Sequence, residues 1–246
     1  MTLEACVNSA PSAIEAANGG ADRVELCENM AEGGCTPSHG SIVLARKMIS
    51  IGLFVMIRPR GSDFFYSDEE FDVMKEDILM AKNVGADGVV FGLLNPDGTV
   101  DKERTKKLVD LSGPMEVTFH RAFDMTNDPF QAMEDLISLG IGRILTSGQQ
   151  ENVLSGANLI RELIMNANGR IVIMPGGGIK EYNIKEVIEA TGAREYHLYL
   201  PKSLPSRMKF INKNIHLGKK DSPEFESVIV DAEKIRKVKE IMKTNG

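Results

Sequence analysis

Two short segments of this sequence carry a glutamate followed two positions later by a cysteine. The first holds Glu4 and Cys6, and the second holds Glu25 and Cys27. Both segments are apolar and strand-length, and residues two positions apart in a β-strand point to the same face. If both faces point into one interior, the four side chains converge there. Two thiols on neighbouring strands, about 4.8 Å apart, are suitable ligands for one soft cation.

Both cysteines also have a purely structural interpretation. Free cysteines are often buried as small apolar side chains, so Cys6 and Cys27 need not bind anything. Equal height of the two thiols is also not assured, because strands in a barrel are staggered.

The two glutamates allow two interpretations as well. A buried carboxylate needs a cation or hydrogen-bond donors, and Arg58 and Arg60 are candidates to supply them in a structural ion pair. In the catalytic alternative, Glu4 or Glu25 is a general base and His120 is the acid.

A second group of residues suits an anion. Arg58, Arg60 and Arg121 lie at or just after the ends of predicted strands, and guanidinium groups bind carboxylate or phosphate oxygens through two parallel hydrogen bonds. Their structural alternative is charge balance for the glutamates. Further candidate anion-binding residues lie in or just after the last three predicted strands, namely Thr146, Ser147, Gly176, Gly177, Gly178 and His197.

The three consecutive glycines allow backbone N–H groups to approach a ligand closely, although a tight turn would also use them.

The sequence argues against several other kinds of catalytic chemistry. No lysine stands at a predicted strand end, since Lys180 lies beyond the glycines, which argues against Schiff-base catalysis. The sequence contains no nucleophile elbow and no dinucleotide-type glycine turn after the first strand, so no organic cofactor is expected.

Eight apolar runs of strand length alternate with amphipathic stretches, which is typical of parallel strands joined by helices. The expected strands are Leu3–Val7, Arg23–Cys27, Leu53–Arg58, Gly88–Gly92, Met115–His120, Arg143–Thr146, Ile171–Met174 and Arg194–Leu198. Helices are expected to begin near Ser9, Ser38, Ser67, Asp101, Asp128, Gly156 and Glu181. Ser67 and Glu70 form a candidate capping box.

The pattern predicts a single-domain α/β protein, a (β/α)8 TIM barrel spanning residues 1–246, which is close to the typical length of about 250 residues. A doubly wound open sheet is the rival fold. Strand eight ends near residue 198, residues 201–223 are expected to form a long loop, and a terminal helix is expected over 231–242. In a barrel of this kind, ligands bind at the C-terminal ends of the strands, where all the candidate residues lie.

Composition narrows the functional classes. Hydrophobic residues make up 42% of the chain and charged residues 26%, with a net charge of −6. These values are typical of globular proteins and argue against nucleic acid as a partner. No apolar run approaches the length of a membrane span, and three cysteines do not form a disulfide framework. A cytoplasmic protein with free thiols is expected, and assembly into a homo-oligomer stays open.

Several motifs in order resemble the CutC family, which is named for copper homeostasis. The resemblance extends from Leu3 to about His197. It rests on Glu4-Ala5-Cys6, the segment 20–27, Gly33-Gly34 with Thr36-Pro37-Ser38, the segment 56–60, Asp63-Phe64 with Tyr66-Ser67, Val90-Phe91-Gly92, the segment 117–124, Leu145-Thr146-Ser147-Gly148 and the segment 175–178. It implies a (β/α)8 barrel, a cytoplasmic location and copper handling, with Cu(I) bound through Cys6 and Cys27.

Whether the chain is an enzyme stays open at this point. The first hypothesis is a copper homeostasis protein that binds Cu(I) at the barrel mouth. The alternative is a TIM-barrel enzyme acting on a small anionic or phosphorylated metabolite, with Glu/His acid–base residues and an arginine anion clamp. The third hypothesis is a barrel with a purely structural or partner-binding role. The expected partner is accordingly a copper ion or a small anionic ligand.

Overall fold

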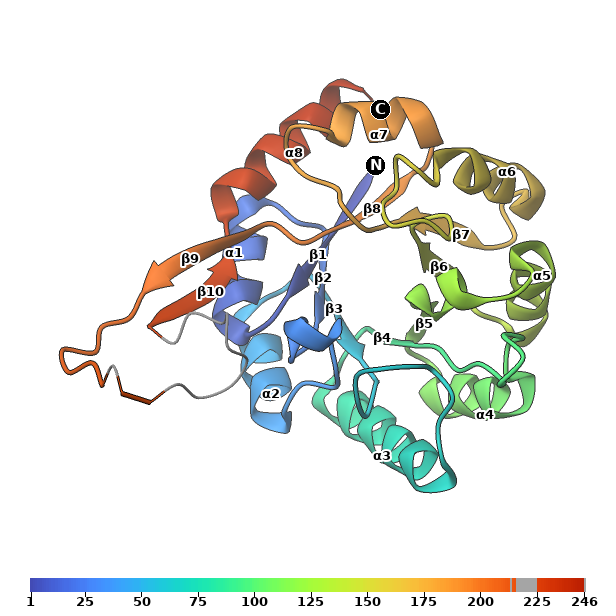
Figure 1. The fold of residues 1–246 in the computed structure, drawn as a ribbon, viewed down its shortest axis with the longest axis horizontal. Coiled ribbons are helices and arrows are strands. Elements are labelled where there is room, and N and C mark those ends of the chain that lie inside the picture. The colour runs from blue at the N-terminus through green and yellow to red at the C-terminus, as the bar shows by residue number, and fades with distance from the viewer. Residues whose placement is uncertain (213, 216–224, 246) are drawn as a thin grey trace.

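Eight parallel strands form a ring, and helices cover its outer side (Figure 1). The computed structural model describes residues 1–212, 214–215 and 225–245. Neighbouring strands follow chain order around the ring, and β1 pairs with both β2 and β8. A bridge between Gly176, just beyond β7, and His197 in β8 closes the ring. The strands are β1 (Thr2–Val7), β2 (Arg23–Leu26), β3 (Gly52–Met56), β4 (Gly88–Phe91), β5 (Glu116–Phe119), β6 (Arg143–Thr146), β7 (Val172–Pro175) and β8 (Glu195–Leu198).

The observed strands confirm the predicted (β/α)8 barrel, and each begins and ends within two residues of its expected bounds. The helices are α1 (Ala10–Gly19), α2 (His39–Met48), α3 (Asp68–Val84), α4 (Lys102–Ser112), α5 (Pro129–Leu139), α6 (Ala157–Ala167), α7 (Ile184–Thr191) and α8 (Ala232–Thr244). Short 3-10 helices, η1 (Met30–Glu32) and η2 (Arg121–Met125), follow β2 and β5.

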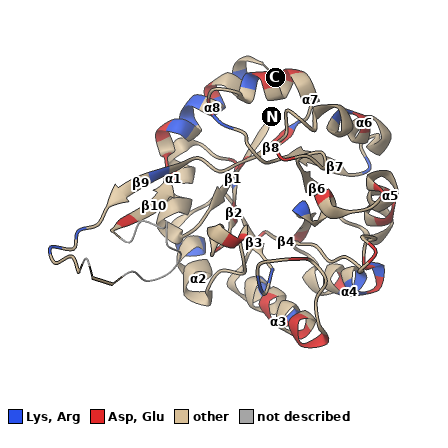
Figure 2. Ribbon diagram, in the orientation of Figure 1, with Lys and Arg blue, Asp and Glu red and all other residues tan. Residues whose placement is uncertain are grey.

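Helix starts agree with the capping residues read from the sequence. The Ser67 hydroxyl accepts from the Glu70 N–H, and the Glu70 carboxylate accepts from the Ser67 N–H, so the predicted capping box is present. The Asp231 carboxylate caps α8 by accepting from the Glu233 N–H. Charged residues of both signs lie on the outward faces of α3, α4 and α8 (Figure 2). Among the described residues, no helix is long and apolar enough to cross a membrane.

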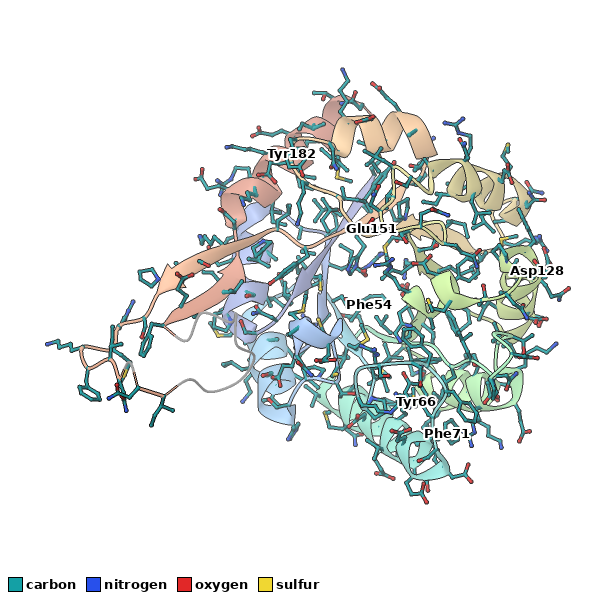
Figure 3. All side chains as sticks on the ribbon, viewed as in Figure 1. Phe54, Tyr66, Phe71, Asp128, Glu151 and Tyr182 are labelled. Carbon is teal, nitrogen blue, oxygen red and sulfur yellow. The ribbon has the colours of Figure 1, made fainter. Side chains whose placement is uncertain are left out.

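Two buried layers result from the alternation of side chains along the strands. The larger layer lies between the strands and the helices and contains residues such as Leu3, Val24 and Phe119. The smaller layer lies inside the ring and contains Cys6, Cys27, Phe54, Met56 and Val90. Side chains therefore fill the ring that the ribbon leaves open, with Phe54 near its centre (Figure 3). The predicted inward faces of β1 and β2 are confirmed by this arrangement.

The prediction that residues 201–223 form one long loop is wrong for the first part of this segment. Its first residues form β9 (Pro201–Pro205), which pairs antiparallel with β10 (Glu226–Val230). The two strands project from the barrel beside α1 (Figure 1). Pro201 and Pro205 favoured a loop because proline lacks a backbone N–H, but both lie in an isolated two-stranded sheet, where outward-facing positions need no N–H donor. The rest of the predicted loop includes residue 213 and residues 216–223, which lie outside the described residues.

Candidate functional site

A cavity of about 480 Å³ opens among the loops at the C-terminal ends of the strands. Its position agrees with the general location of binding sites in this fold. The predicted residues that line it are Cys6, Glu25, Cys27, Arg58, His120, Arg121, Gly177, Gly178 and His197. The predicted residues that do not line it are Glu4, Arg60, Thr146, Ser147 and Gly176.

The two thiols meet on one wall of the cavity. The Sγ atoms of Cys6 and Cys27 lie 3.6 Å apart, and both cysteines are buried and free. The strand register places Cys6 beside Glu25 and not beside Cys27, yet the thiols still reach each other. The proximity of Cys27, together with burial, raises the pKa of the Cys6 thiol. Without a bound cation, Cys6 therefore stays protonated.

A third sulfur belongs to this wall and was not predicted. Met30 lies in η1, three residues after Cys27, and its Sδ lies 3.3 Å from the Cys27 Sγ. Gly34 also lies against this wall, since a Cβ at that position would be 3.4 Å from the Cys27 Sγ. The ligand atoms of Cys6, Glu25 and Cys27 all lie within 4.8 Å of one another. The wall therefore offers two thiols, a thioether and one carboxylate.

Glu4 lies below the cavity and is held by two partners. Its Oε1 lies 2.7 Å from the Nδ1 of His197, and its Oε2 accepts from the Nε of Arg23. Burial raises the pKa of Glu4, but the hydrogen bond from His197 and the charge of Arg23 outweigh burial and hold the pKa at about 2. Arg23, rather than the expected Arg58 and Arg60, is its cation. Glu4 is thus an ionised anchor.

Glu25 is less well satisfied than Glu4. Its Oε2 lies 3.6 Å from the Nε2 of His197, and its Oε1 has no hydrogen-bond partner among the described residues. Burial raises the pKa of the Glu25 carboxyl. Burial lowers the pKa of His197, but the nearby carboxylates of Glu25 and Glu4 outweigh it and raise the pKa above its ordinary value. Glu25, which is 2% exposed, therefore presents a free acceptor oxygen to the cavity.

An ion-pair layer supports the site from inside the barrel. Glu195 Oε2 accepts from Arg23 Nη2 at 2.5 Å and from Arg143 Nε at 2.6 Å. Both guanidinium groups lie over the ring of Phe54, at 5.1 and 5.5 Å from its centroid. The sequence analysis missed this layer, although Arg23 and Glu25 alternate at the spacing that revealed the Glu-Cys pairs. Charged residues inside the other short predicted strands were the sequence signal that could have revealed this layer.

The three predicted arginines have different environments. Arg58 lines the cavity, but its guanidinium donates to the carbonyls of Glu32, Gly34 and Ser62 and so fixes the loop after β2. Arg60 is held outside the cavity by Glu70 and Asp63. The chain leaves β3 at Met56, so the alternation that would have aligned positions 58 and 60 stops. The structure does not bring Arg60 to the candidate anion site.

Arg121 lines the cavity and is held by Asp124. Its Nε donates to the Asp124 Oδ2 at 2.7 Å, and its Nη2 donates to the Ser147 Oγ at 2.7 Å. Thr146 and Ser147, predicted as anion donors, instead donate to the carboxylate of Asp124. They do not line the cavity, and they act by holding the carboxylate that orients Arg121.

The glycine turn after β7 divides into two parts. The N–H of Gly176 donates to the Thr146 carbonyl, so this residue belongs to the barrel closure. Gly177 and Gly178 have φ values of +116° and +75° and line the cavity. Such conformations favour glycine, which explains the residue type without a ligand. The turn also brings Lys180 to the cavity wall, although no lysine was expected near the site; its Nζ donates to the Tyr199 carbonyl at 2.7 Å.

His120 lies across the ring from the thiols, since β5 is on the far side from β1 and β2. Burial and the charge of Arg58 lower the pKa of His120 to about 3, so its imidazole is neutral. Its Nδ1 accepts from the Ala122 N–H at 3.1 Å, which places the proton of the neutral ring on Nε2. The Nε2 atom is buried and has no partner in the described part of the chain.

Comparison with known proteins agrees with the fold. A model of the CutC family matches residues 1–201. The human copper homeostasis protein cutC homolog is 48% identical over 242 residues, which cover 98% of this chain and 89% of the human protein. A CutC family protein of Parabacteroides distasonis is 47% identical over 236 residues, covering 95% of this chain and 97% of that protein. The solved structure of the Streptococcus agalactiae CutC protein aligns with a TM-score of 0.77 at 35% identity and covers 80% of this chain and 97% of that chain. Since the similarity includes the strands that carry the cysteines, the glycine turn and the barrel itself, this chain belongs to the CutC family.

Proposed function

We propose that the protein takes part in copper homeostasis by binding Cu(I) through Cys6 and Cys27 at the mouth of its barrel. The observation that carries this proposal is the pair of buried, uncrosslinked thiols, 3.6 Å apart on the wall of a cavity. Family relatives named as copper homeostasis proteins support the same assignment.

The donor set fits a soft monovalent cation. Thiolate and thioether sulfurs select Cu(I) over hard cations, and Met30 places a thioether beside Cys27. The sulfur atoms are carried by β1, by the residue that directly follows β2 and by η1, which β-sheet hydrogen bonds and the loop contacts of Arg58 hold together. Glu25 is a harder ligand and is less suited to Cu(I). We therefore assign Cys6 and Cys27 as the ligands and Met30 as the additional sulfur.

Free thiols of this kind persist in a reducing compartment, so we propose the cytoplasm as the place of action. Fractionation of cells expressing the tagged chain tests the location. Recovery in a membrane or secreted fraction would contradict it.

The copper proposal is tested by anaerobic titration of Cu(I) against a competing chromogenic chelator. We expect one Cu(I) per chain for the wild type and loss of that site in the Cys6→Ser, Cys27→Ser double variant. Cys35→Ser is the matched control, because Cys35 is also a free cysteine but does not line the cavity. Circular dichroism confirms that each variant is folded. Cu(I) binding by the double variant as tight as that of the wild type would overturn the assignment.

A further inference from the structure

A second wall of the cavity carries hydrogen-bond donors that copper binding does not use. They come from η2, which follows β5, and from the glycine turn after β7. This wall is made of different residues from the sulfur wall. Its chemistry is therefore separable from the proposed copper site.

The first donor is the guanidinium of Arg121. Its Nε and Nη2 are engaged by Asp124 and Ser147, while its Nη1 has no hydrogen-bond partner in the described part of the chain. Nη1 lies against the glycine turn, because a Cβ at Gly177 would be 3.5 Å from it. Two anchored nitrogens fix the direction of the third. Arg121 thus presents one preoriented cationic donor at the cavity.

The second donor is a backbone N–H group in the same turn. The Gly177 carbonyl accepts from the Val153 N–H, and the Gly178 carbonyl accepts from the Asn183 side chain. The Gly177 N–H is directed at the His197 carbonyl in the bridge that closes the barrel, whereas the Gly178 N–H has no acceptor among residues 1–212, 214–215 and 225–245. Backbone N–H groups in glycine turns bind oxyanions in other proteins.

The third donor is the Nε2–H of His120. This atom is buried without a partner, although an unpaired buried polar group is unfavourable. The residue is 3% exposed and lines the same cavity as Arg121 and the glycine turn. Phe64 packs against its ring, with centroids 5.0 Å apart, and holds its orientation. A ligand oxygen is the acceptor that this geometry lacks.

We propose that this wall binds a small organic oxyanion, a carboxylate or phosphate monoester, whose anionic group lies at Arg121 and the Gly178 N–H and whose carbonyl oxygen accepts from His120 Nε2. The proposal goes beyond copper binding and does not depend on it. Cavity size agrees, since about 480 Å³ is within the range of small-molecule pockets, roughly 300–1,000 Å³.

Four probes test the proposal by isothermal titration of the metal-free chain. Acetate and inorganic phosphate carry only the anionic group, whereas pyruvate and dihydroxyacetone phosphate add a carbonyl to it. We expect one carbonyl compound to bind about tenfold more tightly than its simple anion, as one additional hydrogen bond allows. Whether pyruvate or dihydroxyacetone phosphate gains the affinity identifies the anionic group. If none of the four binds with a Kd below about 10 mM, the proposal is overturned.

Variants assign the binding to this wall. Arg121→Gln is expected to weaken binding about tenfold, and His120→Phe is expected to reduce the carbonyl compound to the affinity of its simple anion. Arg60→Gln is the matched control, because Arg60 is an arginine near the barrel mouth that does not line the cavity. The Cys6→Ser, Cys27→Ser variant should bind the probe like the wild type, which separates this test from that of copper binding. Equal losses in Arg60→Gln and Arg121→Gln, or none in either, would overturn the assignment.

Discussion

Among single residues, His120 makes folding stability depend on pH. Burial and Arg58 lower its pKa from 6.5 to about 3, and Phe64 and Phe119 pack around its ring. The stabilisation from keeping this imidazole neutral is fully present above pH 6.5. As the pH falls toward 3, the unfolded chain binds a proton that the folded chain does not, so stability falls by up to about 1.4 kcal/mol per pH unit.

We therefore expect the wild type to lose about 2 kcal/mol more stability than His120→Gln between pH 7 and pH 5. Urea denaturation at both pH values measures this difference. Using a difference between two proteins removes the contribution of groups that titrate in both, including Glu25 and His197. Identical losses in the two proteins would show that His120 is not held neutral by its surroundings.

Arg23 is the residue on which the ion-pair layer depends. It contacts Glu4 and Glu195, and its side chain is 9% exposed. Arg23→Met leaves Glu4 with His197 alone in the barrel interior, and removing one partner of a buried pair costs about 3–5 kcal/mol. Arg170→Met is the control, since Arg170 pairs with Glu134 on the surface, where such pairs contribute about 0–1 kcal/mol. Chemical denaturation midpoints compare the two, and a similar small loss in both would contradict a supporting role for the layer.

Residues within strands were predictable, whereas several in loops were not. Period-two alternation placed Glu4, Cys6 and Glu25 on inward faces because backbone geometry fixes that alternation. This alternation ends with the last residue of a strand, which is why the Arg58 side chain lines the cavity and the Arg60 side chain does not. Met30 reaches the site through a 3-10 turn, and Lys180 reaches it through the glycine turn; neither path has a fixed side-chain period.

At the scale of elements, the turn after β7 takes part in two features: the closure of the barrel, and the cavity wall at which we propose that the oxyanion binds. Gly177→Ala adds a Cβ 3.3 Å from the Ser147 Cβ and 3.5 Å from Arg121 Nη1, at a φ of +116°. We expect a stability loss of about 1–3 kcal/mol from backbone strain. We also expect about tenfold weaker binding of the oxyanion probe, because the tight contact shifts Ser147, whose hydroxyl accepts from Arg121 Nη2.

Gly20→Ala is the control that separates the effect of backbone strain from the effect of displacing neighbouring side chains. Gly20 caps α1 with a φ of +91°, and a Cβ there would have nothing within 4 Å. This variant should lose stability but keep the wild-type affinity for the probe. Calorimetry and titration on both variants measure the two effects. Unchanged probe binding by Gly177→Ala would show that the turn does not position Arg121.

The elements themselves follow from local signals that tertiary packing reinforces. Ser9, Ser38, Ser67, Asp101 and Asp128 each accept a hydrogen bond from the first turn of the following helix, so helix starts were readable. The pair β9 and β10 was not readable, because two prolines bound β9 and its partner lies more than 20 residues further along. Its position depends on contacts distant in sequence, such as the Val230 N–H to the Ser12 hydroxyl at 3.2 Å.

For the whole molecule, a ligand that binds the folded chain more tightly than the unfolded one raises its stability. Of the proposed Cu(I) ligands, Cys6 lies on β1 and Cys27 directly follows β2, and the pairing of these strands exists only in the folded barrel. At a free Cu(I) concentration a hundredfold above Kd, stabilisation is about 2.7 kcal/mol, or about 5–10 °C in Tm for a chain of this size. Anaerobic differential scanning calorimetry with buffered Cu(I) measures the shift.

The cysteine variants are the controls for the Cu(I)-induced shift in Tm. Unfolded chains also bind Cu(I) through any cysteine, which reduces the net stabilisation. Cys35→Ser removes one such unfolded-state ligand and leaves the folded site intact, so its Cu(I)-induced shift should equal or slightly exceed that of the wild type. The Cys6→Ser, Cys27→Ser variant keeps only Cys35 and should show no upward shift. An upward shift of wild-type size in that variant would place the copper elsewhere in the molecule, because the barrel would then be stabilised without its two inward-facing thiols.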